Sequence, residues 1–238
     1  GVLTVILDSI SRNNGGHQGA GFKLWSKESW LVNSVSYNNA KAGVIVRPRH
    51  EGKSPTYILN STFVLNNSGR YAGQVATSPK LPQKGNLLFY IYNNIFYTLN
   101  SSAIVINEVD RQTVAGEGHN YYVLVHDPER DAHWSFKHAI HLRERGREVV
   151  DGFGFEEVAG GGRWARVTEH GEGNIGITAK PSQRPLVFVD LGGGDLRLHG
   201  ASKAIDAGRP VGVGHDITGA PVPVGKARDL GAYEFRGR

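Results

Sequence analysis

Short apolar runs separated by Asn-rich and Gly-rich turns fill the first hundred residues of the chain. In Gly21-Phe22-Lys23-Leu24-Trp25, apolar and polar residues alternate, and later runs are rich in aromatic and β-branched residues. Successive side chains of a β-strand point to opposite faces, so a period of two is typical of strands. The pattern therefore predicts many short strands and few helices.

The pattern repeats. Four similar segments begin at Asp8, Asn33, Asn60 and Asn93, and each leads into a second short strand, at 21–24, 43–46, 73–76 and 103–106. We align the Asn residues at 14, 39, 67 and 100, which follow one another at 25, 28 and 33 residues. A constant motif with loops of variable length indicates a solenoid of stacked coils. An Asn repeated at an inward corner would form a hydrogen-bonded ladder along the axis.

The remaining residues are less regular. We expect one domain of 238 residues, with regular coils over 1–107, an irregular excursion over 108–185 and a tail over 186–238. A short helix is predicted around residues 138–144, and the Gly-rich residues 152–176 are expected to form a loop with one or two strands, such as 164–167.

Composition narrows the chemistry. The absence of cysteine excludes disulfides, zinc–thiolate sites and a catalytic Cys. Methionine is also absent, even at position 1, and the chain opens inside a strand-like run, so we expect a fragment with an upstream N-terminus. No apolar run is long enough to span a membrane. A net charge of +5 fits an acidic partner, yet the Lys and Arg form no long runs, so scattered solubilising charge is the simpler interpretation.

The tail carries a family resemblance. It contains Phe188-Val189-Asp190, Gly194-Asp195-Leu196-Arg197-Leu198, Ser202-Lys203-Ala204-Ile205-Asp206-Ala207-Gly208 and Asp229-Leu230-Gly231-Ala232-Tyr233-Glu234. This series resembles the C-terminal end of right-handed parallel β-helix proteins, a group rich in secreted bacterial polysaccharide lyases. It departs from their pattern at Lys203, where Pro is usual, and at Val222-Pro223, where Pro-Arg is usual. The resemblance implies an all-β, right-handed parallel β-helix, secreted or at the cell surface, with a covering tail; a fold does not fix an activity.

Four acidic residues of the tail admit two interpretations: Asp206, Asp216, Asp229 and Glu234. Carboxylates together with backbone carbonyls suit Ca²⁺. Alternatively, they cap turns and pair with Arg209 or Arg228 to pin the tail along the coils. We prefer the second interpretation, because the resemblance marks this segment as an end structure.

Lys23 is the strongest candidate for a catalytic residue. Alternation points Phe22 and Leu24 into the core and Lys23 outward with Trp25. The stretch Gly19-Ala20-Gly21-Phe22-Lys23-Leu24 is similar to the one that carries the general-base lysine in family 9 pectate lyases. This resemblance implies β-elimination on a uronic-acid polymer, in which Lys23 removes the proton alpha to the carboxylate.

Four further residues complete this candidate site. Arg47 and Arg49, one coil on, would favour the neutral amine of Lys23 and balance the substrate carboxylate. Trp25 and Asn107 are predicted to bind the substrate. In the resembled lyases the calcium-binding aspartates lie on coils before the lysine, so any Ca²⁺ ligands are expected on coils upstream of this chain. The later outward equivalents of Lys23, taken as Ile45, Val75 and Val105, are apolar, which favours a partly covered face.

Three functions remain open. The leading one is extracytoplasmic polysaccharide processing, most concretely by a lyase that cleaves uronic-acid polymers. The second is a non-catalytic β-helix that binds glycans or serves as a structural surface module. The third is a β-helix glycoside hydrolase, which needs two carboxylates facing one groove, and the strands offer no such pair. We expect an acidic polysaccharide as partner, no nucleic acid, and a monomer. His133, His138 and His141 lack the Glu of a known zinc motif, so an exposed polar surface is the simpler interpretation.

Overall fold

The computed structural model describes residues 2–16, 19–47, 52–66, 73–77, 85–107, 112–127, 129, 139–143, 151–153, 172–183 and 185–237. This part of the chain is almost all β, with one short 3₁₀ helix, η3 Pro181–Gln183. Its strands form three large sheets of mostly parallel strands and one antiparallel pair. The expected all-β class is therefore confirmed.

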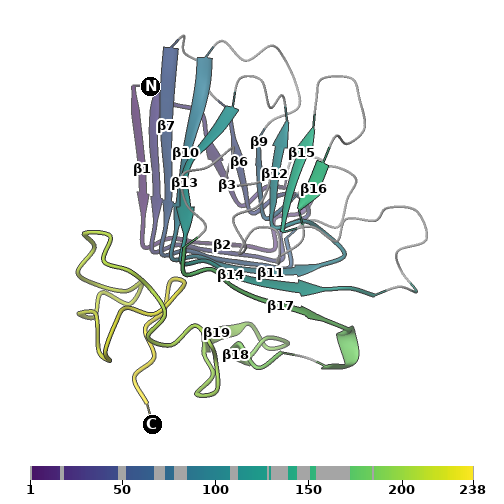
Figure 1. The fold of residues 1–238 in the computed structure, drawn as a ribbon, viewed down its shortest axis with the longest axis vertical. Coiled ribbons are helices and arrows are strands. Elements are labelled where there is room, and N and C mark those ends of the chain that lie inside the picture. Colours follow the sequence, from purple (N-terminus) through teal and green to yellow (C-terminus); the bar gives the residue numbers. More distant parts are fainter. Residues whose placement is uncertain are drawn as a thin grey trace.

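From β1 to β15 the chain visits the three large sheets in rotation, and each circuit adds one strand to each sheet (Figure 1). Sheet A contains β1 Leu3–Leu7, β4 Glu28–Val32, β7 Gly52–Leu59, β10 Gly85–Tyr92 and β13 Gln112–Gly118. Sheet B contains β2 Ile10–Arg12, β5 Val35–Tyr37, β8 Thr62–Val64, β11 Ile95–Leu99, β14 Tyr121–Val125 and β17 Ile175–Ala179. Sheet C contains β3 Phe22–Leu24, β6 Val44–Val46, β9 Val75–Thr77, β12 Ile104–Asn107, β15 Ile140–Arg143 and β16 Asp151–Phe153. All neighbours pair in parallel except β15 and β16, which are antiparallel.

The rotation continues past residue 107, where the sequence repeat was expected to end. Strands β13, β14 and β15 each join the sheet that the order of visits requires, and β17 then extends sheet B. The helix predicted around residues 138–144 is wrong for the described residues, because 140–143 form β15. Ile140 is buried and pairs with Ile104 of the preceding circuit, so its place in the core outweighs any local helix preference. The strand predicted at 164–167 lies outside the described residues.

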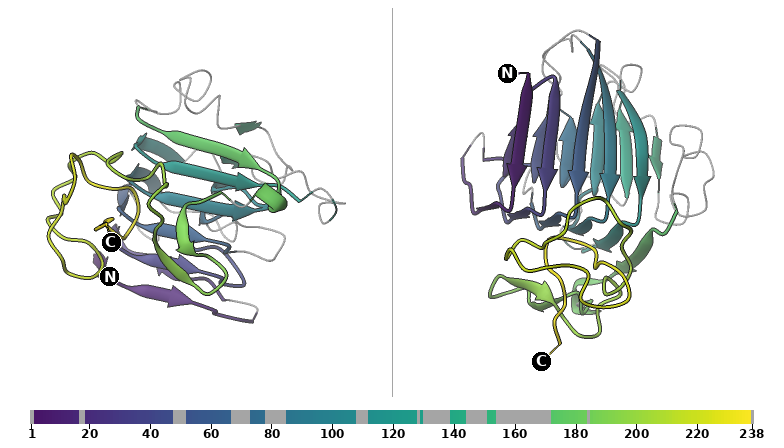
Figure 2. Two further views of the ribbon diagram at one scale, coloured as in Figure 1. Left: turned by 90° about the horizontal axis from the view of Figure 1, so that it is seen from below. Right: turned by 90° about the vertical axis from the view of Figure 1, so that its left-hand side faces the viewer.

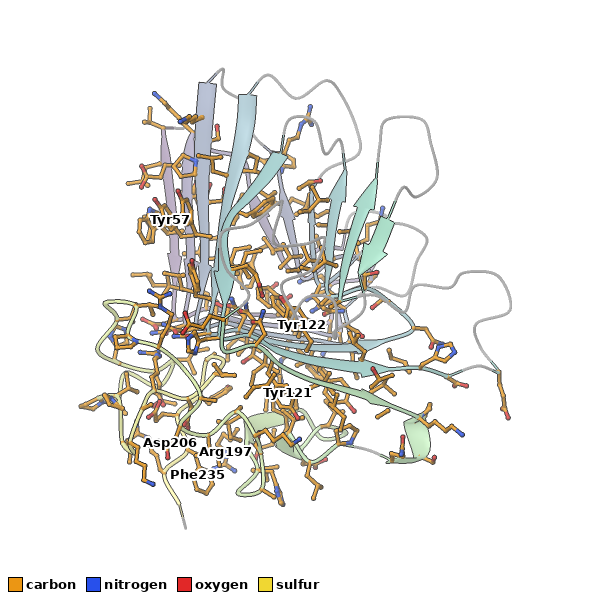
Figure 3. All side chains as sticks on the ribbon, viewed as in Figure 1. Tyr57, Tyr121, Tyr122, Arg197, Asp206 and Phe235 are labelled. Atoms are coloured by element: carbon orange, nitrogen blue, oxygen red, sulfur yellow. The ribbon has the colours of Figure 1, made fainter. Side chains whose placement is uncertain are left out.

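The interior is filled by residues that repeat from circuit to circuit. Phe63, Phe96 and Tyr122 stack along the axis from β8, β11 and β14, with ring centroids 5.4 Å apart in each pair. Their neighbours along the strands point to the other side of sheet B. In Figure 3, Tyr122 points into the interior and Tyr121 points toward the C-terminal tail. The central strands β8, β11 and β14 are thus buried on both faces of sheet B.

A ladder of side chains closes the corner between sheets A and B. The backbone N–H at each corner donates to a side-chain oxygen on the next circuit, at 2.8–3.3 Å. The members of this ladder are Ser9, Ser34, Ser61, Asn94, Asn120 and Asn174. Glu117 is fully buried at its far end and accepts hydrogen bonds from Asn120, Asn174 and Tyr122. The ladder gives these buried donors their partners.

A second ladder closes the corner between sheets B and C, where the sequence predicted one. Asn14 N–H donates to Asn39 Oδ1 at 3.0 Å, and Asn39 N–H donates to Asn66 Oδ1 at 3.1 Å. The third member is therefore Asn66, and the predicted Asn67 is wrong. Asn100, the predicted fourth member, instead exchanges hydrogen bonds with Asp127.

The reason for the shift lies in backbone conformation. Each circuit needs a residue at positive φ just before the inward Asn, and this residue is Asn13 (φ 55°), Asn38 (φ 51°) and then Leu65 (φ 48°). In the third circuit Leu65 occupies the position of positive φ that Asn13 and Asn38 occupy before it. The inward residue is therefore the first Asn of the third pair and not the second.

The tail covers a face of the stack. Residues 185–237, with the antiparallel pair β18 Phe188–Asp190 and β19 Asp195–Leu198, lie along the outer side of sheet B (Figures 1 and 2). Phe188, Leu198 and Leu230 of the tail share an apolar cluster with outward residues of sheet B such as Ile95 and Tyr121.

The tail is also bound along the first corner. His119 Nδ1 lies 3.1 Å from the Ala207 carbonyl, and Asn93 exchanges hydrogen bonds of 2.7 and 3.0 Å with the backbone of Arg209. Asn33 donates to the His215 carbonyl at 2.9 Å, and the His215 side chain lies 3.1 Å from Asp8. Residues 207–215 therefore run back along the corner from the fifth circuit to the first.

Replacing Asn39 tests the ladder. Asn39 is 2% exposed, accepts from Asn14 N–H and donates to Asn66, so Asn39→Ala leaves buried polar groups without partners. We expect a loss of about 2–4 kcal/mol in the free energy of unfolding, measured by urea titration. Asn38→Gly is the matched control. It removes the adjacent exposed side chain and keeps the positive φ, so it should cost less than about 1 kcal/mol. Equal losses would show that the inward ladder adds nothing specific.

Candidate functional site

Lys23 lies where alternation predicts it. It is exposed on the outer face of β3, the first strand of sheet C, while Leu24 is buried in the core. The strand register places Ile45, Ala76 and Val105 beside Lys23 on successive circuits. The expectation that Val75 belongs to this outward row is wrong, because Val75 is fully buried in the main core.

The outer face of sheet C becomes covered along the axis. Ile45 is half-buried, and Ala76 and Val105 are 4% and 2% exposed in a small apolar cluster with Ala42. This burial agrees with the expectation of a partly covered face. The part of the row that a large ligand reaches from solvent is therefore at Lys23.

Two of the other predicted residues stand near Lys23. Trp25 directly follows β3, and Lys23 Nζ lies 5.8 Å from the centroid of its ring, within the range of a cation–π interaction. Arg47 directly follows β6 on the next circuit, and its N–H donates to the Leu24 carbonyl at 2.9 Å. Asn107 ends β12, three strands from β3 and so roughly 14 Å along the axis. Arg49 lies outside the described residues.

Positive charge is concentrated at this end of the molecule. Residues 1–53 contain seven Lys and Arg and three Asp and Glu, so they carry four of the five net positive charges of the chain. Four of these cations lie on or next to the first two strands of sheet C. Lys23 is on β3 and Lys27 follows it, while Lys41 precedes β6 and Arg47 follows it. We call these four residues the basic end of sheet C.

The acidic residues nearby do not fit a calcium site. Glu28 is the only Asp or Glu between residues 21 and 47, and its Oε1 accepts a hydrogen bond from Trp30 Nε1 at 2.7 Å. Within the part of the chain that the structure describes, no group of three or more His, Asp or Glu side chains could hold a metal ion. No chemical step is therefore assigned to Ca²⁺ here. Two of the histidines considered from the sequence, His133 and His138, lie outside the described residues.

The tail carboxylates act as caps of turns. Asp216 accepts from the N–H groups of Thr218, Ala220 and Glu234. Asp229 accepts from the N–H groups of Asp206 and Phe235, at 2.7 and 2.5 Å. Glu234 accepts from the N–H groups of Val224 and Asp229, and Asp206 from that of Ala227. Backbone donors hold these oxygens, which supports the interpretation as caps.

The two arginines named with these carboxylates bind the stack through other groups. Arg228 is 6% exposed and donates to Asn33 Oδ1 and to the carbonyls of Val213 and His215. The Arg209 guanidinium lies 4.8 Å from the ring of Tyr92. Both pin the tail along the circuits, as expected, but through amide, carbonyl and aromatic partners.

An aromatic column on sheet A was not identified from the sequence as a site. Trp30, Tyr57 and Tyr90 occupy the same outward position on β4, β7 and β10, and their rings stack along the axis. The signal was available, because each of them stands three residues before the first Asn of a repeat, at 33, 60 and 93.

Comparisons with protein-family models, with curated proteins and with solved structures find no match for this chain. No helix of the described residues is long and apolar enough to cross a membrane.

Burial of Asp229 leads to a prediction about pH. Desolvation raises the pKa of Asp229 from 3.8 to about 6, although its hydrogen bonds from Phe235 and Asp206 favour the charged form. The native state then binds more protons than the unfolded state between these values, so this group's contribution to stability falls as pH rises through the window. The Asn side chain of the Asp229→Asn variant does not titrate, and its N–H₂ group faces backbone N–H donors. The variant should therefore be less stable than the wild type at pH 4.

The measurement is the melting temperature of both proteins from pH 4 to pH 7. The gap between wild type and Asp229→Asn should narrow by at least about 2 °C as pH rises from 4 to 7, because a carboxyl with a pKa of about 6 becomes fully charged only above that value. Titrating groups that do not interact with Asp229 cancel in this difference. A gap that stays constant with pH would contradict the raised pKa.

Proposed function

We propose that this chain is a right-handed parallel β-helix protein that works outside the cytoplasm and binds an acidic polysaccharide at the basic end of sheet C. The observation that carries the proposal is the concentration of positive charge in residues 1–53, beside an outward Trp. The rotation of strands through three parallel sheets supports the β-helix, and the tail motif supports a secreted protein of that group.

The chemistry of this surface suits a polyuronate. Lys23 and Lys27 are exposed on one circuit, and Arg47 is half-buried one strand further along the axis, so three cations lie on two neighbouring circuits. A polymer with one carboxylate on each sugar meets this group with charge pairs, while the Trp25 ring offers an apolar face to a sugar. Exposed charge pairs contribute little one by one, so binding depends on several pairs acting together.

A second candidate is β-elimination at the same surface. The observation that favours it is the placement of Lys23 and Arg47 on neighbouring circuits of one outer face. In this mechanism the Lys23 amine takes the proton alpha to the carboxylate, and the bond from C4 to the glycosidic oxygen breaks. Arg47 balances the charge that grows on the carboxylate.

Binding is tested with charge-removing variants. We expect polygalacturonate and alginate to retard the wild type in affinity electrophoresis. Lys23→Gln together with Arg47→Gln should weaken binding about tenfold, and added salt should reduce the difference, because exposed charges are screened. Lys203→Gln, on the exposed surface of the tail, is the matched control and should bind as the wild type does. Equal loss in the control variant would point to net charge alone.

Catalysis is tested separately. The wild type is incubated with the same polymers, with and without Ca²⁺, and the absorbance of the unsaturated uronide is followed. β-Elimination predicts that Lys23→Ala abolishes this absorbance, while Lys27→Ala, four residues along, keeps it. Retention of the product in Lys23→Ala would remove Lys23 from the reaction. Binding without any unsaturated product from the wild type would leave the non-catalytic proposal standing and end the catalytic one.

A further inference from the structure

The outer face of sheet A carries a column of three aromatic rings. Trp30 and Tyr57 are stacked with centroids 3.8 Å apart and planes inclined by 17°, and Tyr57 and Tyr90 follow at 4.8 Å and 12°. All three side chains are half-buried, although they point away from the core. In Figure 3, Tyr57 projects from the outer side of sheet A. The ring faces cover one another, so the column presents mainly ring edges to solvent.

Polar groups accompany the rings. Trp30 Nε1 donates to Glu28 Oε1 at 2.7 Å, and Tyr57 and Tyr90 carry phenol hydroxyls. The pKa of Tyr57 is raised, first by burial and then by Tyr90 and Glu28, so these groups lie within electrostatic reach of one another. The column thus combines apolar ring edges, hydroxyls and one carboxylate.

The two ends of the column differ. At one end, Val5 is the neighbour of Trp30, so the column continues with a small, exposed side chain. At the other end, Gly116 follows Tyr90, and a Cβ at Gly116 would clash with the hydroxyl of Tyr92. The other side of Tyr92 is covered by Arg209 of the tail. The accessible stretch therefore runs along Trp30, Tyr57 and Tyr90.

We propose that this column, with Glu28, is a second saccharide-binding surface that takes uncharged sugar residues of a glycan lying along the axis. Sugar hydroxyls match the phenol groups and Glu28, which follow one another along the strands, and the apolar C–H groups between these hydroxyls make van der Waals contact with the half-buried rings. The carboxylate of Glu28 accepts hydrogen bonds from sugar hydroxyls and repels uronates. This surface lies on a different sheet from the basic end of sheet C and is independent of the function proposed for that end.

The polar groups also argue against a protein partner. The centre of a protein interface is depleted of charged residues. Burying the Glu28 carboxylate under an apolar surface would remove its hydration and so disfavour binding. A second copy of the chain would place two such carboxylates in one interface. A neutral glycan keeps every polar group of the column hydrogen-bonded.

The test uses soluble neutral polysaccharides: hydroxyethyl cellulose, galactomannan and dextran. We expect at least one of them to retard the wild type in affinity electrophoresis and to change its tryptophan fluorescence. Trp30→Ala with Tyr57→Ala should weaken this binding at least tenfold. Tyr57→Phe, which removes a single hydroxyl and keeps the stacked ring, should weaken it less. Tyr233→Phe makes the same change on the tail and is the matched control.

Glu28→Gln separates charge from shape. The amide oxygen still accepts from Trp30, so neutral polymers should still bind, while uronates should gain affinity for this surface in a protein that also carries Lys23→Gln and Arg47→Gln. The proposal is overturned if no neutral polymer binds, or if the column variants bind as the wild type does. It is also overturned if sedimentation shows a dimer that the column variants disperse, because the face would then be a contact between copies.

Discussion

The structure depends on hydrogen bonds that satisfy the backbone where each circuit turns between sheets. A corner brings an N–H group into the interior, where water does not reach it. A side-chain oxygen from the next circuit accepts that hydrogen bond at Ser34, Ser61 and Asn94, and again along Asn39 and Asn66. An orphaned buried donor costs about 1–3 kcal/mol, so the corners fix how the circuits stack. Fixed stacking in turn aligns outward side chains into rows such as Lys23 with Ile45 and Trp30 with Tyr57.

Much of this order is visible in the sequence, because the corners need particular residues. Positive φ selects Asn at the turns, and alternation then decides which neighbours point outward, as it did for Lys23. The errors arose where a residue of another type fills a corner. Leu65 has a positive φ where the repeat predicts Asn, so the sequence placed the third ladder member at Asn67. His119 also has a positive φ, at the fifth corner between sheets A and B, and without an Asn at this position the repeat was not recognised past residue 107.

The contacts of the tail could not be predicted in the same way. Asn93 bonds to Arg209 and Asn33 to Arg228, across 116 and 195 residues of sequence. No local sequence pattern marks either pair. The position of the tail depends on the apolar outer face of sheet B and on the residues at the corner between sheets A and B. The resemblance of the tail to an end structure favoured caps for its carboxylates, but the partners of the two arginines follow from where the tail lies.

The corner between sheets C and A separates two surfaces of different character. Lys27 and Glu28 are adjacent in sequence, yet one belongs to the basic end of sheet C and the other opens β4 beside the aromatic column. Because alternation and the corner ladders hold these side chains in register, the sign of the charge changes within one step of the chain. On the two proposals above, a glycan that passed from one surface to the other would meet cations first and a carboxylate next. Such a boundary would sort sugars by charge, since each surface would repel or leave unpaired what the other binds.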